Sequence, residues 1–220
     1  MADRSFLSWP FFEERHTALY DHVEAWAKAH AAIMHGKDES SATAAAVVRN
    51  LVAAMGEDGF LATATGGTAD ALFGPLDVRS LCICREVLAR YGGLADFAFA
   101  MQGLGSGAIS IGGSASQRQA YLPQVARGAR IAAFALSEPE AGSDVAAMQL
   151  RAAGARPDCV AGQKDDSYFL DGRKTWISNG GIADFYCVFA KTDPAGGSRG
   201  ISAFIVDAGT PGLDDSAHIP

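Results

Sequence analysis

The chain is poor in cysteine and lacks a long apolar run, and both shortages exclude classes of protein. Its four cysteines, Cys82, Cys84, Cys159 and Cys187, show no C-x-x-C spacing and have no histidine close in sequence. We therefore expect no zinc or other metal site, and we interpret the cysteines as reduced, mostly buried thiols of a cytoplasmic protein. No apolar run reaches the roughly 20 residues that a membrane helix needs, and the first residues lack a signal-peptide core, so no membrane partner is expected.

Basic residues are also scarce. The 220 residues carry 18 Lys and Arg against 25 Asp and Glu, which gives a net charge of -7 and a pI of about 5.1. A nucleic-acid surface needs a basic stripe, so nucleic acid is excluded as a partner. The composition, 49% hydrophobic and 20% charged, is that of an ordinary globular protein with one or two domains.

Residues 1–128 have the apolar periodicity of helices, and we predict an N-terminal all-α domain there. Helices are expected over 11–34, from Ser40 to about 56, over 77–101 with a break at two glycines, and after the capping box of Ser114 and Gln117. Four histidines lie in or beside the first helix without an i, i+4 pair, so we expect them to be exposed or half-buried. The glycine-rich run at 103–108 has no βαβ unit around it and is interpreted as a close helix–helix contact.

From Arg130 the pattern changes to short strands separated by turns. Residues 129–220 are predicted to form an antiparallel, barrel-like β domain that is incomplete, so the fold class is α+β. Asp171 and Gly172 are interpreted as part of a hairpin turn. The expected strands are Ile131–Leu136, Gln149–Ala153, Tyr168–Leu170, Lys174–Ser178, Tyr186–Lys191 and Ile201–Val206.

Two motifs in this half carry the chemistry. The first, Leu-Ser-Glu-Pro-x-Ala-Gly-Ser-Asp at 136–144, follows an apolar strand, and its proline ends regular structure. Free backbone N–H groups and short hydroxyls in such a loop suit a polar ring edge or a phosphate. The second, Gly-x-Lys-Thr-Trp-Ile-Ser-Asn-Gly-Gly at 172–181, places the indole of Trp176 two residues before the hydroxyl of Ser178.

In their order and separation, these motifs resemble those of the acyl-CoA dehydrogenase family. The resemblance implies FAD as cofactor and an acyl-CoA substrate, whose α,β-desaturation sends a hydride to the flavin N5. It also implies electron-transfer flavoprotein as electron acceptor and a homo-oligomer, either a dimer or a tetramer. Carried over by position, Phe134, Leu136 and Ser137 would line one edge of the flavin. Trp176 would pack against the ring, Ile177 would bind the cofactor beside it, and Ser178 would donate a hydrogen bond near N5. Ser143 would reach toward the CoA part of the substrate.

Three of these residues also have a plainer interpretation. Trp176 could be a core residue of a strand, because buried tryptophans usually are. Ser137 could cap the turn together with Glu138, and Ser143 could be a turn-former with Asp144. Glu138 and Glu140 could suggest an acid–base pair, but we expect Glu138 to be structural.

The resemblance places the catalytic base, a glutamate, in a C-terminal helical domain that has no counterpart in these residues. We therefore assign no catalytic residue in this chain and expect the chain alone to be inactive, as a fragment or as half of a two-chain assembly. Two other functions remain open. One is a related enzyme in which the reduced flavin reacts with oxygen, such as an acyl-CoA oxidase or a flavin monooxygenase. The other is a non-catalytic subunit that pairs with another chain.

Overall fold

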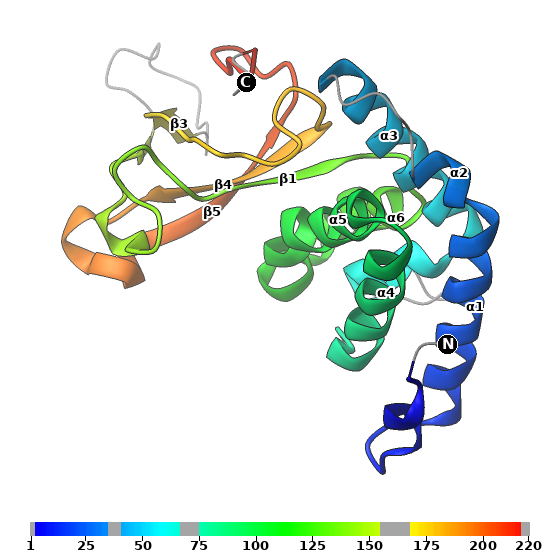
Figure 1. The fold of residues 1–220 in the computed structure, drawn as a ribbon. Helices are drawn as coiled ribbons and strands as arrows, with labels where there is room; N and C mark the ends of the chain where they lie inside the picture. Colours follow the sequence, from blue (N-terminus) through cyan, green and yellow to red (C-terminus); the bar gives the residue numbers. More distant parts are fainter. Residues whose placement is uncertain (1–2, 35–40, 67–74, 155–167, 217–220) are drawn as a thin grey trace. The chain divides into compact units, whose positions relative to one another are not determined.

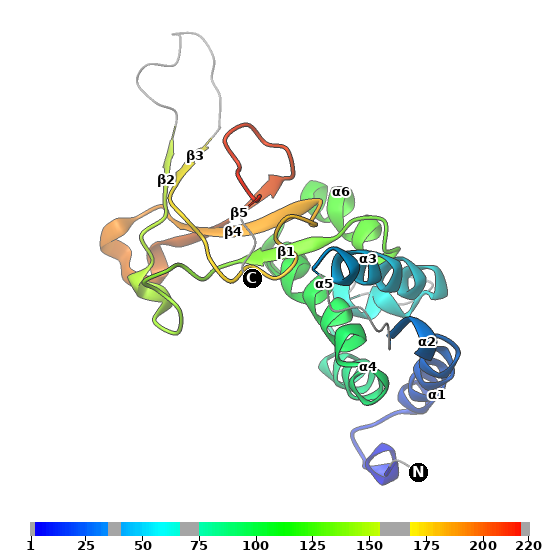
Figure 2. The ribbon, with the colours of Figure 1, turned by 45° about the horizontal axis from the view of Figure 1, so that its top comes forward.

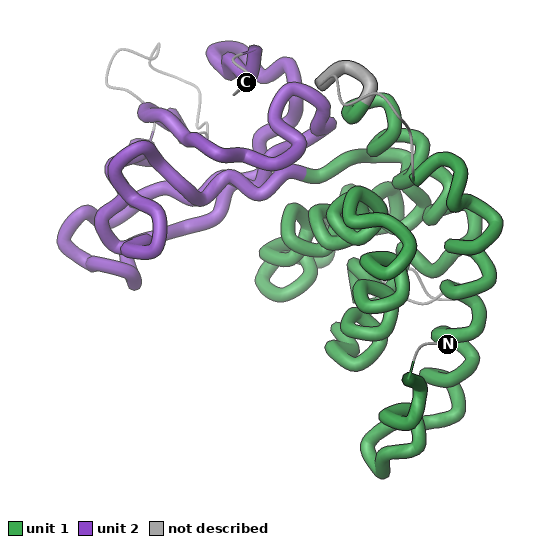
Figure 3. Tube along the Cα trace, in the orientation of Figure 1, with its two compact units in different colours: residues 1–132 green, residues 133–220 purple. Residues whose placement is uncertain are grey.

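The computed structural model describes residues 3–34, 41–66, 75–154 and 168–216. The chain divides into two compact units, Met1–Ala132 and Ala133–Pro220, which are coloured green and purple in Figure 3. Helices occupy the first unit and a sheet occupies the second, so the predicted α+β class is confirmed. No helix in the described part of the chain is both long enough and apolar enough to cross a membrane.

The helices of the first unit follow the predicted order but have different bounds. The expected helix over 11–34 is divided at His30, whose backbone leaves helical geometry (φ -102°, ψ 9°). The break expected in the 77–101 helix lies at Gly92, which is fully extended (φ -176°, ψ 122°). The elements are η1 (Ser5–Ser8), α1 (Glu14–Ala29), α2 (Ala31–Met34), α3 (Ser41–Asp58), η2 (Phe60–Thr65), α4 (Val78–Tyr91), α5 (Gly93–Gly112) and α6 (Ala115–Ala126).

The core of the first unit is built around the 3₁₀ turn η2, which contacts α3, α4, α5 and α6 (Figure 1). The ring of Phe60 lies 5.1 Å from that of Trp26 and 6.2 Å from that of Phe99, centroid to centroid. Leu61 and Leu51 are fully buried beside them. The glycine-rich run at 103–108 lies within α5, where Gly103 faces the carbonyl of Ala64 in η2.

The caps of these helices explain two of the sequence patterns. The predicted capping box of Ser114 and Gln117 is present at the start of α6. The expectation for the histidines was wrong for His16, which is fully buried. Its Nδ1 accepts the N–H of Glu13 at 2.9 Å, and its Nε2 lies 2.9 Å from the carboxylate of Asp77. His16 therefore helps to cap α1 and binds Asp77, the N-cap residue of α4. His35 lies outside the described residues.

The second unit is an open five-stranded sheet with β4 at its centre (Figures 1 and 2). One edge of β4 pairs antiparallel with β5, from Phe185 opposite Asp207 to Lys191 opposite Ile201. Its other edge is shared by β1 and β2, and β3 pairs with β2. The strands are β1 (Ala132–Ala135), β2 (Arg151–Gly154), β3 (Tyr168–Asp171), β4 (Phe185–Lys191) and β5 (Ile201–Asp207), with 3₁₀ turns η3 (Val145–Ala147) and η4 (Pro194–Gly200).

The sheet differs in one respect from the antiparallel prediction. β2 and β4 run parallel where Arg151 lies opposite Lys191, so the sheet is mixed. Five of the six predicted strands correspond to β1–β5 with shifts of one or two residues at their ends, and the sixth, Lys174–Ser178, is not a strand. Burial raises the pKa of Cys84 in α4 to about 12 and that of Cys187 in β4 to about 11. Cys82 is exposed, and Cys159 lies outside the described residues.

Candidate functional site

The loop that follows β1 is closed by its own backbone. The N–H of Glu138 donates to the carbonyl of Ala141 at 2.9 Å, and the N–H of Ala141 donates back to Glu138 at 3.2 Å. This reciprocal pair holds Pro139 and Glu140 at the tip of a tight turn, both exposed. The proline fits there because it has no N–H to offer to a ladder.

Glu138 is a buried carboxylate that joins three segments. Its side chain is only 5% exposed, and its two oxygens accept the N–H groups of Gln149 at 2.5 Å and Leu150 at 3.0 Å. The ammonium of Lys174 lies 2.9 Å from the same carboxylate. Burial by itself raises the pKa of Glu138, but the bonds from Gln149, Lys174 and Leu150 outweigh it and hold the pKa below its usual value. These contacts give Glu138 the structural role expected from the sequence.

Lys174 links the second motif to the first. Its side chain is 8% exposed, and its Nζ donates to the carbonyl oxygen of Leu136 at 2.9 Å as well as to Glu138. One residue later, the N–H of Thr175 donates to the carbonyl of Ser137 at 2.9 Å. The structure thus brings the two motifs into direct contact through one side chain and one backbone hydrogen bond.

The chain from Lys174 to Ser178 was predicted as a strand, and that prediction was wrong. In the described residues, the segment makes a single backbone bond to the first motif, from Thr175 to Ser137, and Trp176 has a left-handed conformation with φ 57°. Asn179 is also left-handed with φ 64°, and its carbonyl accepts the N–H groups of Ile182 and Ala183. A β ladder cannot continue through such residues. The predicted hairpin turn at Asp171 and Gly172 was therefore also wrong. A hairpin needs a strand on each side of the turn, and here β3 precedes these residues but no strand directly follows them.

The left-handed backbone leaves Trp176 with 71% of its surface exposed. This exposure excludes the interpretation of Trp176 as a core residue of a strand. A left-handed conformation costs a non-glycine residue on the order of 1–2 kcal/mol. Strain of this kind is concentrated at functional sites, and an exposed indole offers a flat apolar surface to a ligand.

The other predicted ring-binding residues lie on two faces. Phe134, Leu136 and Ser137 are half-buried, and the ring of Phe134 lies 5.0 Å from that of Phe189 on β4. Alternate residues of a strand point to opposite sides of the sheet, so Phe134 and Ala135 face opposite ways. The half-buried Ile177 and Ser178 follow Trp176 on the second motif.

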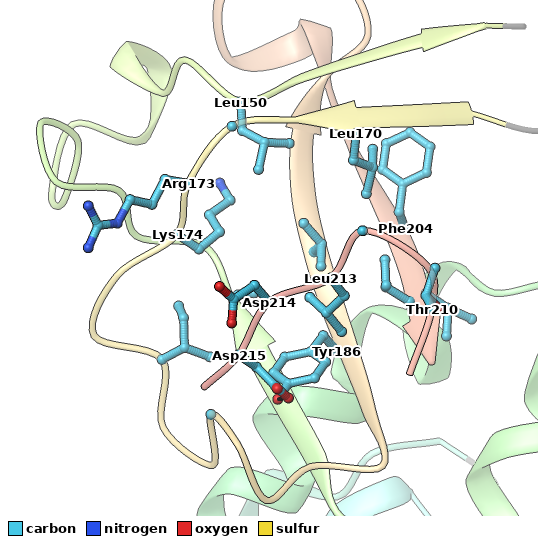
Figure 4. A pocket seen from close by; sticks show the side chains of 18 of the residues that line it. Leu150, Leu170, Arg173, Lys174, Tyr186, Phe204, Thr210, Leu213, Asp214 and Asp215 are labelled. Carbon is cyan, nitrogen blue, oxygen red and sulfur yellow. Dashed lines mark hydrogen bonds between the residues drawn. The ribbon is translucent and has the colours of Figure 1, made fainter. Parts of the chain in front are cut away.

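One face of the sheet carries a groove of about 1240 Å³, shown in Figure 4. Ala135, Trp176, Ile177 and Ser178 line it, whereas Phe134 and the residues of the first motif do not. The two motifs therefore contact each other through Lys174 and Thr175, but only some of the predicted site residues line the groove. Much of the groove wall is apolar, and its labelled side chains include Leu150, Leu170, Tyr186, Phe204 and Leu213.

A second polar cluster closes the groove on the side of residues 210–215. The hydroxyl of Tyr186 donates to the carboxylate of Asp215 and accepts the N–H of Gly181 at 3.0 Å. Burial raises the pKa of Tyr186 to about 12, with a further contribution from Asp215. The sequence analysis missed this cluster, as it missed the contacts of Lys174. The lysine could have been noticed inside the second motif, but nothing in the sequence connects Tyr186 with Asp215.

The site has hydrogen-bonding groups to offer a ligand. Within the described part of the chain, neither the Ser137 hydroxyl nor the Ser178 hydroxyl has a hydrogen-bond partner. Ser143, the residue predicted to reach toward CoA, is exposed beyond the turn, and no hydrogen bond joins it to the second motif in the described residues. An exposed indole and a free hydroxyl in one groove, as at Trp176 and Ser178, fit a planar ring with a polar edge, which is the shape of a flavin.

Comparison with known proteins identifies the family of the chain. The family model of the acyl-CoA dehydrogenase N-terminal domain matches residues 13–129, and that of the acyl-CoA dehydrogenase middle domain matches residues 133–218. A 2-methylacyl-CoA dehydrogenase, mitochondrial, of Solanum tuberosum is 37% identical over 157 residues, which are 70% of this chain and 36% of the relative. The chain therefore spans about a third of the length of this relative.

Solved structures give the same result for the fold. An acyl-CoA dehydrogenase of Bacillus anthracis complexed with FAD is 27% identical with a TM-score of 0.71, and the match covers 96% of this chain and 34% of that one. A chain solved in work on the electron transferring flavoprotein of Acidaminococcus fermentans is 30% identical with a TM-score of 0.70 and covers 93% of this chain and 50% of its own. With both motifs in contact and both domains matched, the chain belongs to the acyl-CoA dehydrogenase family.

Proposed function

We propose that this chain carries the ring-binding part of an FAD site and serves the α,β-desaturation of an acyl-CoA thioester. The exposed, left-handed Trp176, which lines one groove together with the free hydroxyl of Ser178, is the observation that carries the proposal. Membership of the family and the Bacillus anthracis relative complexed with FAD support it. When bound, FAD supplies the two-electron acceptor for the dehydrogenation.

The residues of this chain would bind and orient the cofactor, which would accept the electrons. Phe134, Leu136 and Ser137 would lie along one edge of the ring, where the backbone N–H and the hydroxyl of Ser137 can donate. A donor fixed in advance stabilises negative charge that develops at that edge without reorganising during the reaction. Trp176 and Ile177 would exclude water from the ring, and the hydroxyl of Ser178 would donate near the hydride-accepting atom.

Ser143 would bind the substrate instead of the cofactor. Its exposed hydroxyl lies beyond the reciprocal turn of Glu138 and Ala141, where it can meet a polar part of a CoA thioester. The 2-methylacyl-CoA relative supports a CoA thioester as the substrate class. We assign no catalytic base to this chain and propose that these residues alone do not complete the reaction.

Further proposals concern the assembly. Electron transferring flavoprotein is the proposed electron acceptor, supported by the Acidaminococcus fermentans structure. A homo-oligomer, dimer or tetramer, and a cytoplasmic location also remain proposals. Light scattering of the purified protein gives the oligomeric state, and mixing with an electron transferring flavoprotein tests for electron transfer from the reduced flavin.

The proposal is tested by FAD titration of Trp176→Ala and Ser178→Ala, both in the full protein. We expect weaker FAD retention and slower flavin reduction, because the first loses the flat cover of the ring and the second loses a donor. The matched control is Trp9→Ala, which removes an indole that is also exposed but lies in the first unit. Unchanged flavin content and reduction rate in Trp176→Ala would contradict the assignment of Trp176 to the ring.

Two other functions are separated by simple measurements. Rapid oxygen consumption after flavin reduction would favour an oxidase or a monooxygenase over a dehydrogenase. Co-purification with a second polypeptide that supplies a helical domain, together with absence of flavin chemistry, would favour a non-catalytic subunit. Nothing in the geometry of the site favours either of these over the dehydrogenase.

A further inference from the structure

We propose that Lys174 is a positioning residue that strengthens the Ser137 N–H as a hydrogen-bond donor, acting through the carbonyl group of Leu136, and that Glu138 holds Lys174 in place for this task. The inference rests on the proposed function only in its last step, where the Ser137 N–H meets the ligand. Its geometric part concerns residues of the second unit alone and is independent of any cofactor.

The first step is the orientation of one peptide group. The carbonyl of Leu136 points to the Nζ of Lys174 at 2.9 Å. The residues that the structure describes contain no cis peptide bond, so the peptide between Leu136 and Ser137 is trans. In a planar trans peptide the N–H points opposite to the C=O. The Ser137 N–H therefore points away from Lys174, and it has no hydrogen-bond partner within the described residues.

The second step is polarisation. A cation at the carbonyl oxygen draws electron density through the peptide group and makes its N–H a better donor. Hydrogen bonds arranged in such a chain strengthen one another by roughly 10–30% each. The effect is large here because Lys174 is only 8% exposed, so water screens its charge little.

The third step explains why the buried ammonium stays in place. A buried ammonium group needs a partner of opposite charge, and the Glu138 carboxylate lies 2.9 Å from the Lys174 Nζ. Glu138 is itself fixed by the N–H groups of Gln149 and Leu150, so it cannot follow Lys174 outward. The chain of contacts thus runs from the backbone before β2, through Glu138 and Lys174, to the Leu136 carbonyl.

Local geometry keeps the neighbouring segment close enough for these contacts. Gly172 has φ 149° and passes directly over Leu150, where an added Cβ would lie 2.8 Å from the Leu150 Cα. A side chain at 172 would push the second motif away from the backbone that binds Glu138. The absence of a side chain at Gly172 therefore keeps the backbone of Lys174 close to Glu138.

The inference is tested first without flavin, by the NMR chemical shift of the Ser137 amide proton in Lys174→Met. We expect this proton to move upfield, as a weaker donor does, while the amide protons of the first unit stay unchanged. The matched control is Arg173→Met, which removes an exposed cation from the adjacent position and should leave Ser137 unchanged. An unchanged Ser137 amide in a folded Lys174→Met variant would overturn the inference.

The second readout uses the FAD-loaded protein. Lys174→Met should weaken FAD binding about twofold, since it removes only the roughly 10–30% by which the cation strengthens one hydrogen bond. It should also make the flavin midpoint potential more negative, because the reduced ring loses stabilisation at the edge that gathers charge. Arg173→Met should do neither. Equal effects of both variants would show a general charge effect and would contradict a path through Leu136.

Removal of Lys174 leaves Glu138 without its cation, so the variant could unfold for that reason alone. The double variant Glu138→Gln/Lys174→Met removes both charges and keeps the volume, and buried pairs replaced together are tolerated better than pairs broken on one side. It should fold and still show the upfield Ser137 shift. Loss of the fold in both variants would assign the pair a structural role only and overturn the inference. Failure of the unmodified protein to bind FAD would contradict the proposed function instead.

Discussion

Gly56 on α3 lies against the carbonyl group of Arg127, the residue that ends α6, with no room for a methyl group between them. A Cβ built at Gly56 would lie 2.2 Å from both the carbonyl carbon and the oxygen of Arg127, and 2.4 Å from the nitrogen of Gly128. All three atoms are backbone and cannot rotate away. The absence of a side chain at position 56 therefore lets α3 approach the end of α6.

We predict that Gly56→Ala destabilises the first unit, although alanine is the better helix former. Overpacking against backbone costs about 1–3 kcal/mol or more, which outweighs the gain of about 0.5–1 kcal/mol that alanine gives inside a helix. Gly107→Ala on α5 is the matched control, since no atom from outside α5 lies within 4 Å of its built Cβ. Urea unfolding should show a loss of stability for the first variant and a small gain for the second, and equal gains would contradict the close approach.

A second prediction concerns the acid stability of the sheet unit. The pKa of Glu138 is lowered in the folded state by its backbone and Lys174 bonds, which outweigh burial. Its contribution to stability is therefore present above the unfolded pKa of about 4.3 and is lost as pH falls through the lower folded value. We expect Glu138→Gln to reduce the stability at pH 7 and to flatten the loss below about pH 5. Parallel pH–stability curves for the two proteins would refute this prediction.

A third prediction follows from the strain at Trp176. Glycine adopts φ 57° freely, so Trp176→Gly removes about 1–2 kcal/mol of strain and adds about 0.5–1 kcal/mol of backbone entropy cost. Thermal unfolding without flavin should show unchanged stability or a gain of up to about 1.5 kcal/mol, while FAD binding weakens. Trp9→Gly is the control, because Trp9 is also exposed but has an ordinary φ of -69°. It should lower stability, and an equal loss in both would argue against strain at Trp176.

A fourth prediction concerns Asp77, the N-cap residue of α4. Its carboxylate accepts from the Arg79 N–H and the Ser80 hydroxyl and lies beside His16 and Arg15. Burial opposes ionisation, but these bonds outweigh it and hold the pKa of Asp77 below its usual value. Asp77→Ala should cost about 1–3 kcal/mol, since it removes a cap and the partner of a buried histidine.

The control for Asp77 is another Asp on the same unit. Asp96→Ala removes a bidentate bond to Arg85, whose side chain is 55% exposed, and should cost less than about 1 kcal/mol. Denaturant unfolding of the two variants measures the difference. Equal losses would mean that Asp77 acts as an ordinary surface carboxylate.

Local signals predicted much of this fold. The capping box at Ser114 was recognised because both partners lie within three residues, and β4 was recognised from its run of aromatic and β-branched residues. Long-range polar contacts were missed for the opposite reason. Asp77 lies 61 residues from His16, so no local pattern shows that the histidine is buried.

The failure at Lys174–Ser178 has a physical cause of the same kind. Thr, Trp and Ile favour strands, and the sequence does not show that Trp176 is left-handed. The contacts that hold the segment come from Leu136, Ser137 and Glu138, more than 35 residues earlier. The motifs were visible in the sequence, but the side chain that joins them was visible only in the structure.

The central claim is that Trp176 and the end of β1 form part of a flavin site, and a difference absorption spectrum of FAD tests it most directly. FAD is titrated with the unmodified protein, with Trp176→Ala and with Trp9→Ala. The account predicts a saturable change in the flavin band with the unmodified protein and Trp9→Ala, and a weaker one with Trp176→Ala. No change with any of the three, or equal changes with all of them, would contradict it.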